Sequence, residues 1–292
     1  MLKKLNADLF FSPDGYLSLK TGVKSVNVFH DLNFEHYPAD VPFAERFFYR
    51  RYFPRYAHKA ARIATVSEYS KQDIVKTYKV NPDKIDVVYN GANQAYKPLN
   101  YEEKKQTIDK FSGGLPYFLF VGALHPRKNL INLFSAYDIF RKQHTEPVNL
   151  IIVGAKMWWT KAIEKAYENM VFKNDVIFTG RLNISDLKNV FGAALALTYV
   201  SYFEGFGIPI VEAFYTDTPV ITSNVTSMPE VAGDAAILVN PFSPSSIAEA
   251  MLEIANNQNL RDQLIDKSRQ RRKLFSWQQT ADRVWATIEK AF

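Results

Sequence analysis

The amino-acid sequence predicts an α/β protein with two Rossmann-like, doubly wound domains that face a cleft. Three observations predict this fold class: short β-rich apolar runs alternate with longer helical patterns, a polar stretch separates two such series, and 47% of residues are apolar. Strands separated by helices favour parallel sheets built from β-α-β units. The apolar share allows a sizeable core and argues against disorder.

The first series lies in the first third of the 292-residue chain. Period and composition predict strands at 8–11, 25–29, 62–67 and 85–90. The stretches 41–60 and 67–78 have helical patterns, and Ser67 is a suitable N-cap for the second of them. The stretch 89–106 combines Asn-Gly, a proline and charged residues, which is typical of an interdomain connection.

The second series follows that connection. Strands are predicted at 117–122, 149–154, 176–180, 194–200, 219–223 and 235–240. Helices are predicted at 129–143, 160–171, 185–192, from Pro209 onward, at 244–273 and at 275–292. We therefore expect a first domain at 1–95, a second domain at 96–274 and a terminal helix at 275–292.

Composition excludes several classes of protein. The chain has no cysteine, so disulfide frameworks, thiolate metal sites and cysteine nucleophiles are excluded. No apolar run approaches the roughly 20 residues of a spanning helix, and the charged start lacks a secretory signal core. The expectation is a soluble cytoplasmic protein. Nucleic-acid binding is not expected, because the net charge of +6 is modest and no recognition motif occurs.

Most of the excess positive charge lies in the first third of the chain, above all in residues 46–62. There Arg51, Arg55, Lys59 and Arg62 fall at helical spacing beside Phe and Tyr. A basic, aromatic surface of this kind suits anionic lipid headgroups and would place the protein at the inner face of the membrane. The alternative is a helix whose basic side chains cover a core face.

Ligands of open parallel sheets bind beyond the carboxyl ends of strands, and residues 120–130 follow such an end. In FVGALHPRKNL the strand ends near Gly122, and Arg127 and Lys128 come just before a helix. Cations at a helix start oppose the helix dipole, which suggests a bound anion such as phosphate. A solvated basic turn is the alternative. Neither a Walker loop nor G-x-G-x-x-G is present.

A second strand end leads into EGFGIPIVE, where Glu204 and Glu212 bracket two glycines and a proline. Gly205 and Gly207 permit unusual dihedrals, and Pro209 suits a first helical turn. Glu204 is therefore expected in a loop and Glu212 one turn inside a helix. Two separated carboxylates suit the hydroxyls of one elongated ligand, although a capping acid beside a surface glutamate is the alternative.

A third strand end, VFHDLNFEHYP, carries His30 in the first domain. This histidine is expected to face the cleft, with a structural role as the alternative.

Together these segments resemble the family 4 glycosyltransferases, the group 1 glycosyl transferases of GT-B fold. The resemblance rests on EGFGIPIVEA, VGALHPRKN, TVSEYSKQDI, FTGRLNISDL and VTSMPEVAGDAAILVNPFSP, which occur in the family's order over nearly the whole chain. It implies a retaining hexosyltransferase of class EC 2.4 that uses a UDP- or GDP-sugar and a glycan or lipid-linked acceptor in polysaccharide biosynthesis.

The resemblance also implies roles for individual residues. Donor diphosphate binding falls to Arg127, Lys128 and Gly122. Donor sugar binding falls to Glu204 and to the backbone amides of Phe206, Gly207 and Ile208. Ribose binding falls to Glu212, and the nucleobase pocket to Arg181 and Leu182. The implied catalytic residues are Glu204 and His30. The last helix, around Trp277 and Trp285, resembles the family's helix that crosses back toward the first domain.

The resemblance implies no cofactor and no metal ion, in agreement with the absence of any Asp-x-Asp sequence. It departs from the family at the start, because the family's opening strand and glycine-rich loop have no counterpart, so the first domain is expected to be incomplete. The alternatives are a non-catalytic nucleotide-sugar-binding remnant or partner-dependent subunit, and a GT-B epimerase or phosphorylase.

Overall fold

The computed structural model describes residues 6–292 and divides into two units. The first unit combines residues 1–91 with Glu204–Phe206 and Phe275–Phe292. The second unit comprises Ala92–Phe203 and Gly207–Leu274. Three separate segments of the chain therefore form the first unit. The short middle segment, Glu204–Phe206, belongs to the glycine-rich motif.

The first unit is built on a parallel sheet whose described strands follow the order β1-β2-β3-β4. Its strands are β1 (Leu9–Ser12), β2 (Lys24–Phe29), β3 (Arg62–Thr65) and β4 (Ile85–Val87). Its helices are α1 (Asn33–His36), α2 (Phe43–Lys59), α3 (Glu68–Tyr78) and α12 (Trp277–Glu289). All four predicted strands are present, with ends that differ by up to three residues.

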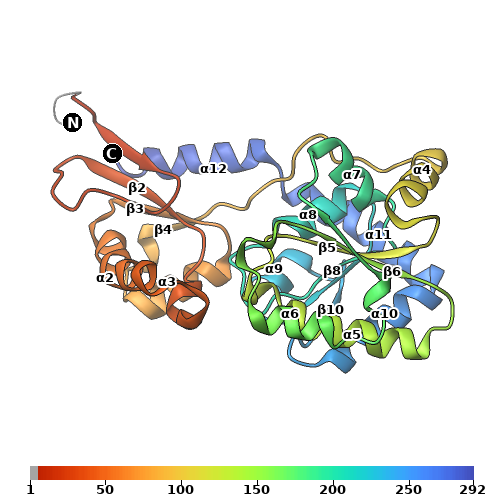
Figure 1. The fold of residues 1–292 in the computed structure, drawn as a ribbon. Coiled ribbons are helices and arrows are strands. Elements are labelled where there is room, and N and C mark those ends of the chain that lie inside the picture. Colours follow the sequence, from red (N-terminus) through yellow and green to blue (C-terminus); the bar gives the residue numbers. More distant parts are fainter. Residues whose placement is uncertain (1–5) are drawn as a thin grey trace. The chain divides into compact units, whose positions relative to one another are not determined.

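Within this unit, α2 and α3 lie on one face of the sheet and α12 lies on the other (Figure 1). The core under α2 consists mainly of aromatic and branched side chains, including Phe29, Phe53, Ile63 and Ile74. Helix α12 packs against β3, and the Thr280 hydroxyl donates to the carbonyl of Tyr89 at 2.7 Å. Ser67 caps α3 as predicted, because its side chain accepts the amide of Ser70 at 3.0 Å.

Two expectations about this region are wrong. Arg62 does not continue the basic face of α2, since the helix ends at Lys59 and Arg62 begins β3. Its guanidinium instead forms an ion pair with Asp86 on the neighbouring strand at 2.6 Å. The connection predicted at 89–106 is also too long, because a helix begins at Tyr101.

The second unit is a six-stranded parallel sheet in the order β10-β9-β8-β5-β6-β7. Its strands are β5 (Tyr117–Val121), β6 (Asn149–Val153), β7 (Val176–Gly180), β8 (Ala196–Tyr199), β9 (Val220–Ser223) and β10 (Ile237–Val239). Its helices are α4 (Tyr101–Ser112), α5 (Leu130–Gln143), α6 (Lys161–Glu168), α7 (Ile184–Gly192), α8 (Ile208–Tyr215), α9 (Met228–Ala232), α10 (Pro244–Asn256) and α11 (Gln258–Arg271). Every predicted strand of this series is present.

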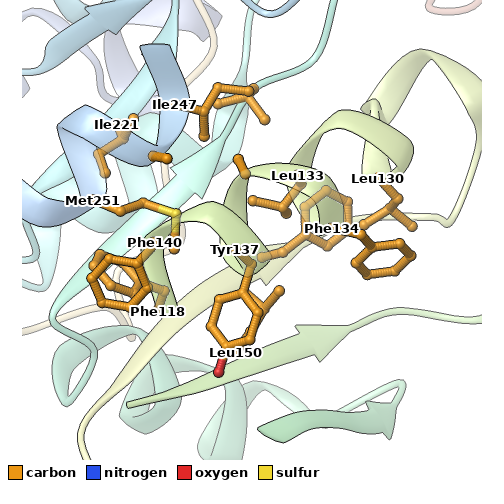
Figure 2. Packing of buried hydrophobic residues seen from close by; sticks show 14 of the residues in the cluster. Phe118, Leu130, Leu133, Phe134, Tyr137, Phe140, Leu150, Ile221, Ile247 and Met251 are labelled. Atoms are coloured by element: carbon orange, nitrogen blue, oxygen red, sulfur yellow. The ribbon is translucent and has the colours of Figure 1, made fainter. Parts of the chain in front are cut away.

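Helices cover both faces of this sheet, with α5, α6 and α10 along one face and α7 and α8 along the other (Figure 1). The largest core lies under α5 and α10, where Phe118, Phe134, Phe140 and Met251 are fully buried. Figure 2 shows these side chains interlocking between the sheet and the two helices. Strands β5 and β6 are buried along their whole length, as the continuous apolar runs predicted.

Candidate functional site

The strand order of the second unit defines where a ligand can bind. From β5 the chain continues to β6 and β7 on one side, and then crosses to β8 on the other side. In sheets of this kind ligands bind beyond the carboxyl ends of the two strands at which the order reverses. The loops that follow β5 and β8 therefore form the candidate site, and both carry motifs singled out in the sequence.

The loop after β5 is held in one shape by its own residues. A 3₁₀ turn spans Pro126–Lys128, and the amide of Arg127 donates to the His125 ring at 3.3 Å. Asn129, which has a positive φ of 63°, ends the turn and begins α5. Its side-chain amide donates to the carbonyl of Val200 at 2.9 Å, which ties this loop to the loop after β8. The sequence analysis did not single out Asn129.

Lys128 is held at the ends of the two central strands. Its ammonium donates to the Tyr199 hydroxyl at 2.6 Å and lies 4.8 Å from the centre of that ring. Its aliphatic stem runs beside Gly122, where a Cβ would lie 3.5 Å from the Lys128 Cε. The carbonyl of Arg127 accepts the amide of Tyr202 at 3.0 Å. The structure thus holds the Lys128 side chain and the Arg127 backbone at the ends of β5 and β8.

A cavity of about 380 Å³ opens at the carboxyl end of β5, β6 and β7. Of the predicted residues, Gly122, Arg181 and Leu182 line it. Met157 and Gly154 line it as well, and neither was singled out in the sequence. A Cβ on Gly154 would overlap the carbonyl oxygen of Gly122, so the two loops meet backbone to backbone. This close approach shapes the cavity and requires glycine at 154.

Helix α8 begins at the glycine-rich motif of the sequence. Gly207 is its N-cap and has a φ of 107°, a conformation that favours glycine. Pro209 lies in the first turn, where its missing amide hydrogen costs nothing. The sequence analysis predicted both features, as well as the position of Glu212 one turn inside the helix.

Glu212 is not a surface glutamate. Burial raises the pKa of its carboxyl to about 7, although a hydrogen bond from Tyr96 opposes the shift. Burial first, and then the nearby Glu212 carboxylate, raise the pKa of the Tyr96 hydroxyl, which therefore remains a donor. Tyr96 is 2% exposed, and its ring packs edge-on against Phe191 at 5.5 Å. Tyr96 was not predicted as a site residue, because it lies in the predicted connection at 89–106.

The other predicted residues, His30, Glu204 and Phe206, belong to the first unit. His30 lines a cavity of about 360 Å³ together with Asp14, Asp31 and Tyr16. Its Nε2 lies 3.0 Å from the carbonyl of Pro13, and its side chain is 55% exposed.

The segment Glu204–Phe206 packs closely on this part of the first unit. The carbonyl of Gly205 accepts the hydroxyl of Ser67 at 2.7 Å, and a Cβ on Gly205 would overlap the carbonyl oxygen of His30. The ring of Phe206 packs edge-on against Phe275 at 5.6 Å. Within the first unit, the structure therefore brings Gly205, the residue after the first acid Glu204, against the backbone of His30.

Two models of known protein families match this chain. Residues 102–271 match the family model of the glycosyl transferases group 1, and residues 1–96 match that of Glycosyltransferase Family 4. The chain belongs to the group 1 glycosyl transferases. The resemblance stated from the sequence motifs is thereby confirmed, and the protein is a member of a family of sugar-transferring enzymes.

Among relatives of this glycosyltransferase is the O-antigen chain mannosyltransferase B of Escherichia coli, 28% identical over 92% of this chain and 71% of that protein. Another is the O-antigen chain mannosyltransferase RfbU of Salmonella typhimurium, 31% identical over 77% of this chain and 59% of its own length. The chain therefore spans less than two thirds of the second relative.

Solved structures show the same fold. A glycosyltransferase from Rickettsia africae matches with a TM-score of 0.77 at 19% identity, covering 99% of this chain and 78% of its own. Anabaena Alr3699/HepE, in complex with UDP and glucose, matches with a TM-score of 0.79 at 17% identity, covering 98% and 79%. The two parallel-sheet α/β domains are thus those of the GT-B fold.

Proposed function

We propose that this glycosyltransferase moves a hexose from a UDP- or GDP-sugar to a glycan or lipid-linked acceptor, with retention of anomeric configuration. The named activity of the two bacterial relatives makes mannose the favoured sugar. The single observation that carries the proposal is the switch-point site, where Lys128 is fixed beside Gly122 and Tyr199 at the edge of a cavity large enough for part of a nucleotide.

In this proposal the second unit binds the nucleotide part of the donor. The guanidinium of Arg127 and the ammonium of Lys128 neutralise the diphosphate, and the amides of Gly207 and Ile208 at the start of α8 add hydrogen bonds. The carboxylate of Glu212 accepts the ribose hydroxyls. The nucleobase lies in the cavity lined by Arg181 and Leu182.

The first unit supplies the groups nearest the reacting carbon. Glu204 contacts the transferred sugar, and the backbone amide of Phe206 donates to its hydroxyls, with His30 beside them. The acceptor oxygen forms a new bond to the anomeric carbon, and the bond from that carbon to the diphosphate breaks. The acceptor's proton passes to a phosphate oxygen of the leaving nucleotide. Fixed positive charge at the leaving group is usually the largest catalytic term in such reactions.

We propose that no metal ion is needed, because in this proposal the side chains of Arg127 and Lys128 neutralise the charge that develops on the leaving diphosphate. Transfer measured in the presence of EDTA should equal transfer in its absence. Loss of transfer that Mg²⁺ or Mn²⁺ restores would contradict this part of the proposal.

The experiment that tests the function is a thermal-shift screen against UDP- and GDP-sugars, GDP-mannose included, followed by a transfer assay with the sugar that binds. The expected result is a rise in melting temperature with one nucleotide sugar, abolished by Arg127→Ala and kept by Lys142→Ala on exposed α5 surface. No shift with any nucleotide sugar would contradict the proposal. Binding without transfer or donor hydrolysis would instead support a non-catalytic, nucleotide-sugar-binding subunit.

A further inference from the structure

The start of α3 carries two serines whose side chains lie inside the first unit. Ser67 is fully buried, and Ser70 is 2% exposed. The Ser67 side chain accepts the amide of Ser70 at 3.0 Å, which caps the helix. A cap of this kind needs only an acceptor, so the hydroxyl protons of both serines remain available for other hydrogen bonds.

Both hydroxyl groups lie at one backbone oxygen, the carbonyl of Gly205. The Ser67 hydroxyl donates to it at 2.7 Å, and the Ser70 hydroxyl donates to it at 3.2 Å. The Ser70 hydroxyl also lies 3.4 Å from the carbonyl oxygen of His30. A carbonyl oxygen has two lone pairs and can accept from both serines at once. The two hydroxyls therefore join the segment Glu204–Phe206 to the loop that follows β2.

Gly205 meets this loop backbone to backbone. A Cβ at this position would overlap the carbonyl oxygen of His30 and would lie 2.9 Å from the Cβ of Asp31. Gly205 has no side chain that could fix its place by packing. Hydrogen bonds to its peptide therefore determine how the segment lies, and the two serines supply two of them.

The same junction also holds the loop of His30 from the other end. Thr65 at the end of β3 is fully buried, and its hydroxyl donates to the carbonyl of Phe29 at 2.7 Å. Buried hydrogen bonds of this kind are stronger than bonds made in water. The residues between β3 and α3 thus bind the backbone beside His30 and the backbone beside Glu204.

We propose that Ser67 and Ser70 are positioning residues for sugar transfer. They hold the Gly205 peptide against the loop of His30, and thereby fix the place of Glu204, the residue directly before it. Neither serine contacts the donor in this proposal. The inference rests on the proposed roles of Glu204 and His30, and it assigns the motif TVSEYSKQDI to positioning rather than to ligand binding.

The test uses the double variant Ser67→Gly/Ser70→Ala. Glycine is tolerated at an N-cap almost as well as serine, and alanine is the best helix former, so α3 should persist without either hydroxyl. Hydrogen–deuterium exchange of the amides in residues 203–208 should become faster, because fewer hydrogen bonds oppose local opening. Asn257→Ala removes the N-cap of α11 in the second unit, and as a control it should leave this segment unchanged.

Transfer should fall in a way that lost stability alone does not produce. A misplacement of about 1 Å can cost on the order of 100-fold in rate, so kcat of the double variant should fall about 10- to 100-fold. The affinity for the nucleoside diphosphate alone should stay unchanged, because that molecule lacks the sugar and its proposed contacts lie in the second unit. Asn257→Ala should keep the wild-type kcat.

Unchanged exchange of residues 203–208 in the double variant would overturn the proposal, and so would faster exchange with wild-type kcat. Equal losses of kcat and of nucleoside diphosphate affinity would also overturn it, because they indicate a general defect. If the double variant does not fold, Ser70→Ala alone leaves the Ser67 cap intact and is measured in the same way. Absence of transfer by the wild type would contradict the proposed function, whereas the exchange comparison would still decide whether the serines hold this segment.

Discussion

At the scale of single residues, Glu212 is a carboxyl group whose protonation is poised near neutral pH. Its pKa is raised from the ordinary value of 4.5 to about 7, mainly because of burial, and the hydrogen bond from the Tyr96 hydroxyl opposes the rise. The folded protein therefore holds a proton between these two pH values that the unfolded chain has already lost. The stabilisation of the folded state by the protonated Glu212 carboxyl is therefore complete below pH 4.5. It falls as the pH rises from 4.5 to about 7.

Glu212→Gln should abolish this loss, because the amide fills the same space and does not ionise. Relative to the wild type, the variant should gain up to about 3 kcal/mol of unfolding free energy at pH 8 and much less at pH 4.5. Urea unfolding of both proteins at the two pH values measures the difference. A gain of equal size at both values would show that the carboxyl is not titrating in the folded state.

Tyr96→Phe tests the positioning role of the tyrosine. Loss of a donor to a charged acceptor costs about 1.5–3 kcal/mol, so the ionised form of Glu212 should become rarer at pH 7. If the carboxylate receives ribose, donor affinity at pH 7 should fall about tenfold and recover at higher pH. Calorimetric titration of the donor from pH 6 to 9 checks this, with exposed Tyr101→Phe as control. An unchanged pH profile would assign Tyr96 a packing role only.

At the scale of elements, the shape of the cavity depends on backbone contact between the loops after β5 and β6. Gly154→Ala should force these loops apart, since the new methyl group would overlap the carbonyl oxygen of Gly122. We expect a loss of about 1–3 kcal/mol in unfolding free energy, together with weaker donor binding. Gly22→Ala is the matched control, because nothing lies within 4 Å of its added methyl group. Equal stability of the two variants would contradict the close approach.

The elements also show which signals the sequence carried. The start of α4 could have been predicted, because Asn100 and Glu103 form a capping box and their spacing of three residues is typical of this motif. The polar composition of 89–106 outweighed that signal in the prediction. The prediction that placed Arg62 on the basic face of α2 was wrong for another reason. Its spacing in the sequence continues that of α2, but its ion pair with Asp86 forms only when β3 and β4 lie side by side.

At the scale of the whole molecule, the first unit is completed by two later parts of the chain, Glu204–Phe206 and Phe275–Phe292. Gly205→Ala tests the first of these, because its methyl group would overlap the carbonyl oxygen of His30. We expect a lower melting temperature, a loss of about 1–3 kcal/mol, and reduced transfer through displacement of Glu204. Unfolding and transfer are measured on the same preparation, and wild-type values of both would contradict the packing described.

The fold class and the order of the main elements could be predicted, because strand and helix periodicities are local features of the sequence. The family could be predicted because several motifs occur together in the order typical of that family. The pairing of Lys128 with Tyr199 and that of Tyr96 with Glu212 could not be predicted, since each joins residues far apart in the chain. The roles of Arg127, Glu204 and His30, the domain limits 1–95 and 96–274, and a cytoplasmic location stay predictions.

The central claim is that the loops at the switch point of the second unit bind the diphosphate of a nucleotide sugar. Calorimetric titration of the donor into Arg127→Ala/Lys128→Ala, beside the wild type and the Lys104→Ala/Lys142→Ala control, tests it most directly. Two charged hydrogen-bonding groups lost at about 1.5–3 kcal/mol each predict an affinity at least 100-fold weaker in the first variant alone. Wild-type affinity in that variant would contradict the claim.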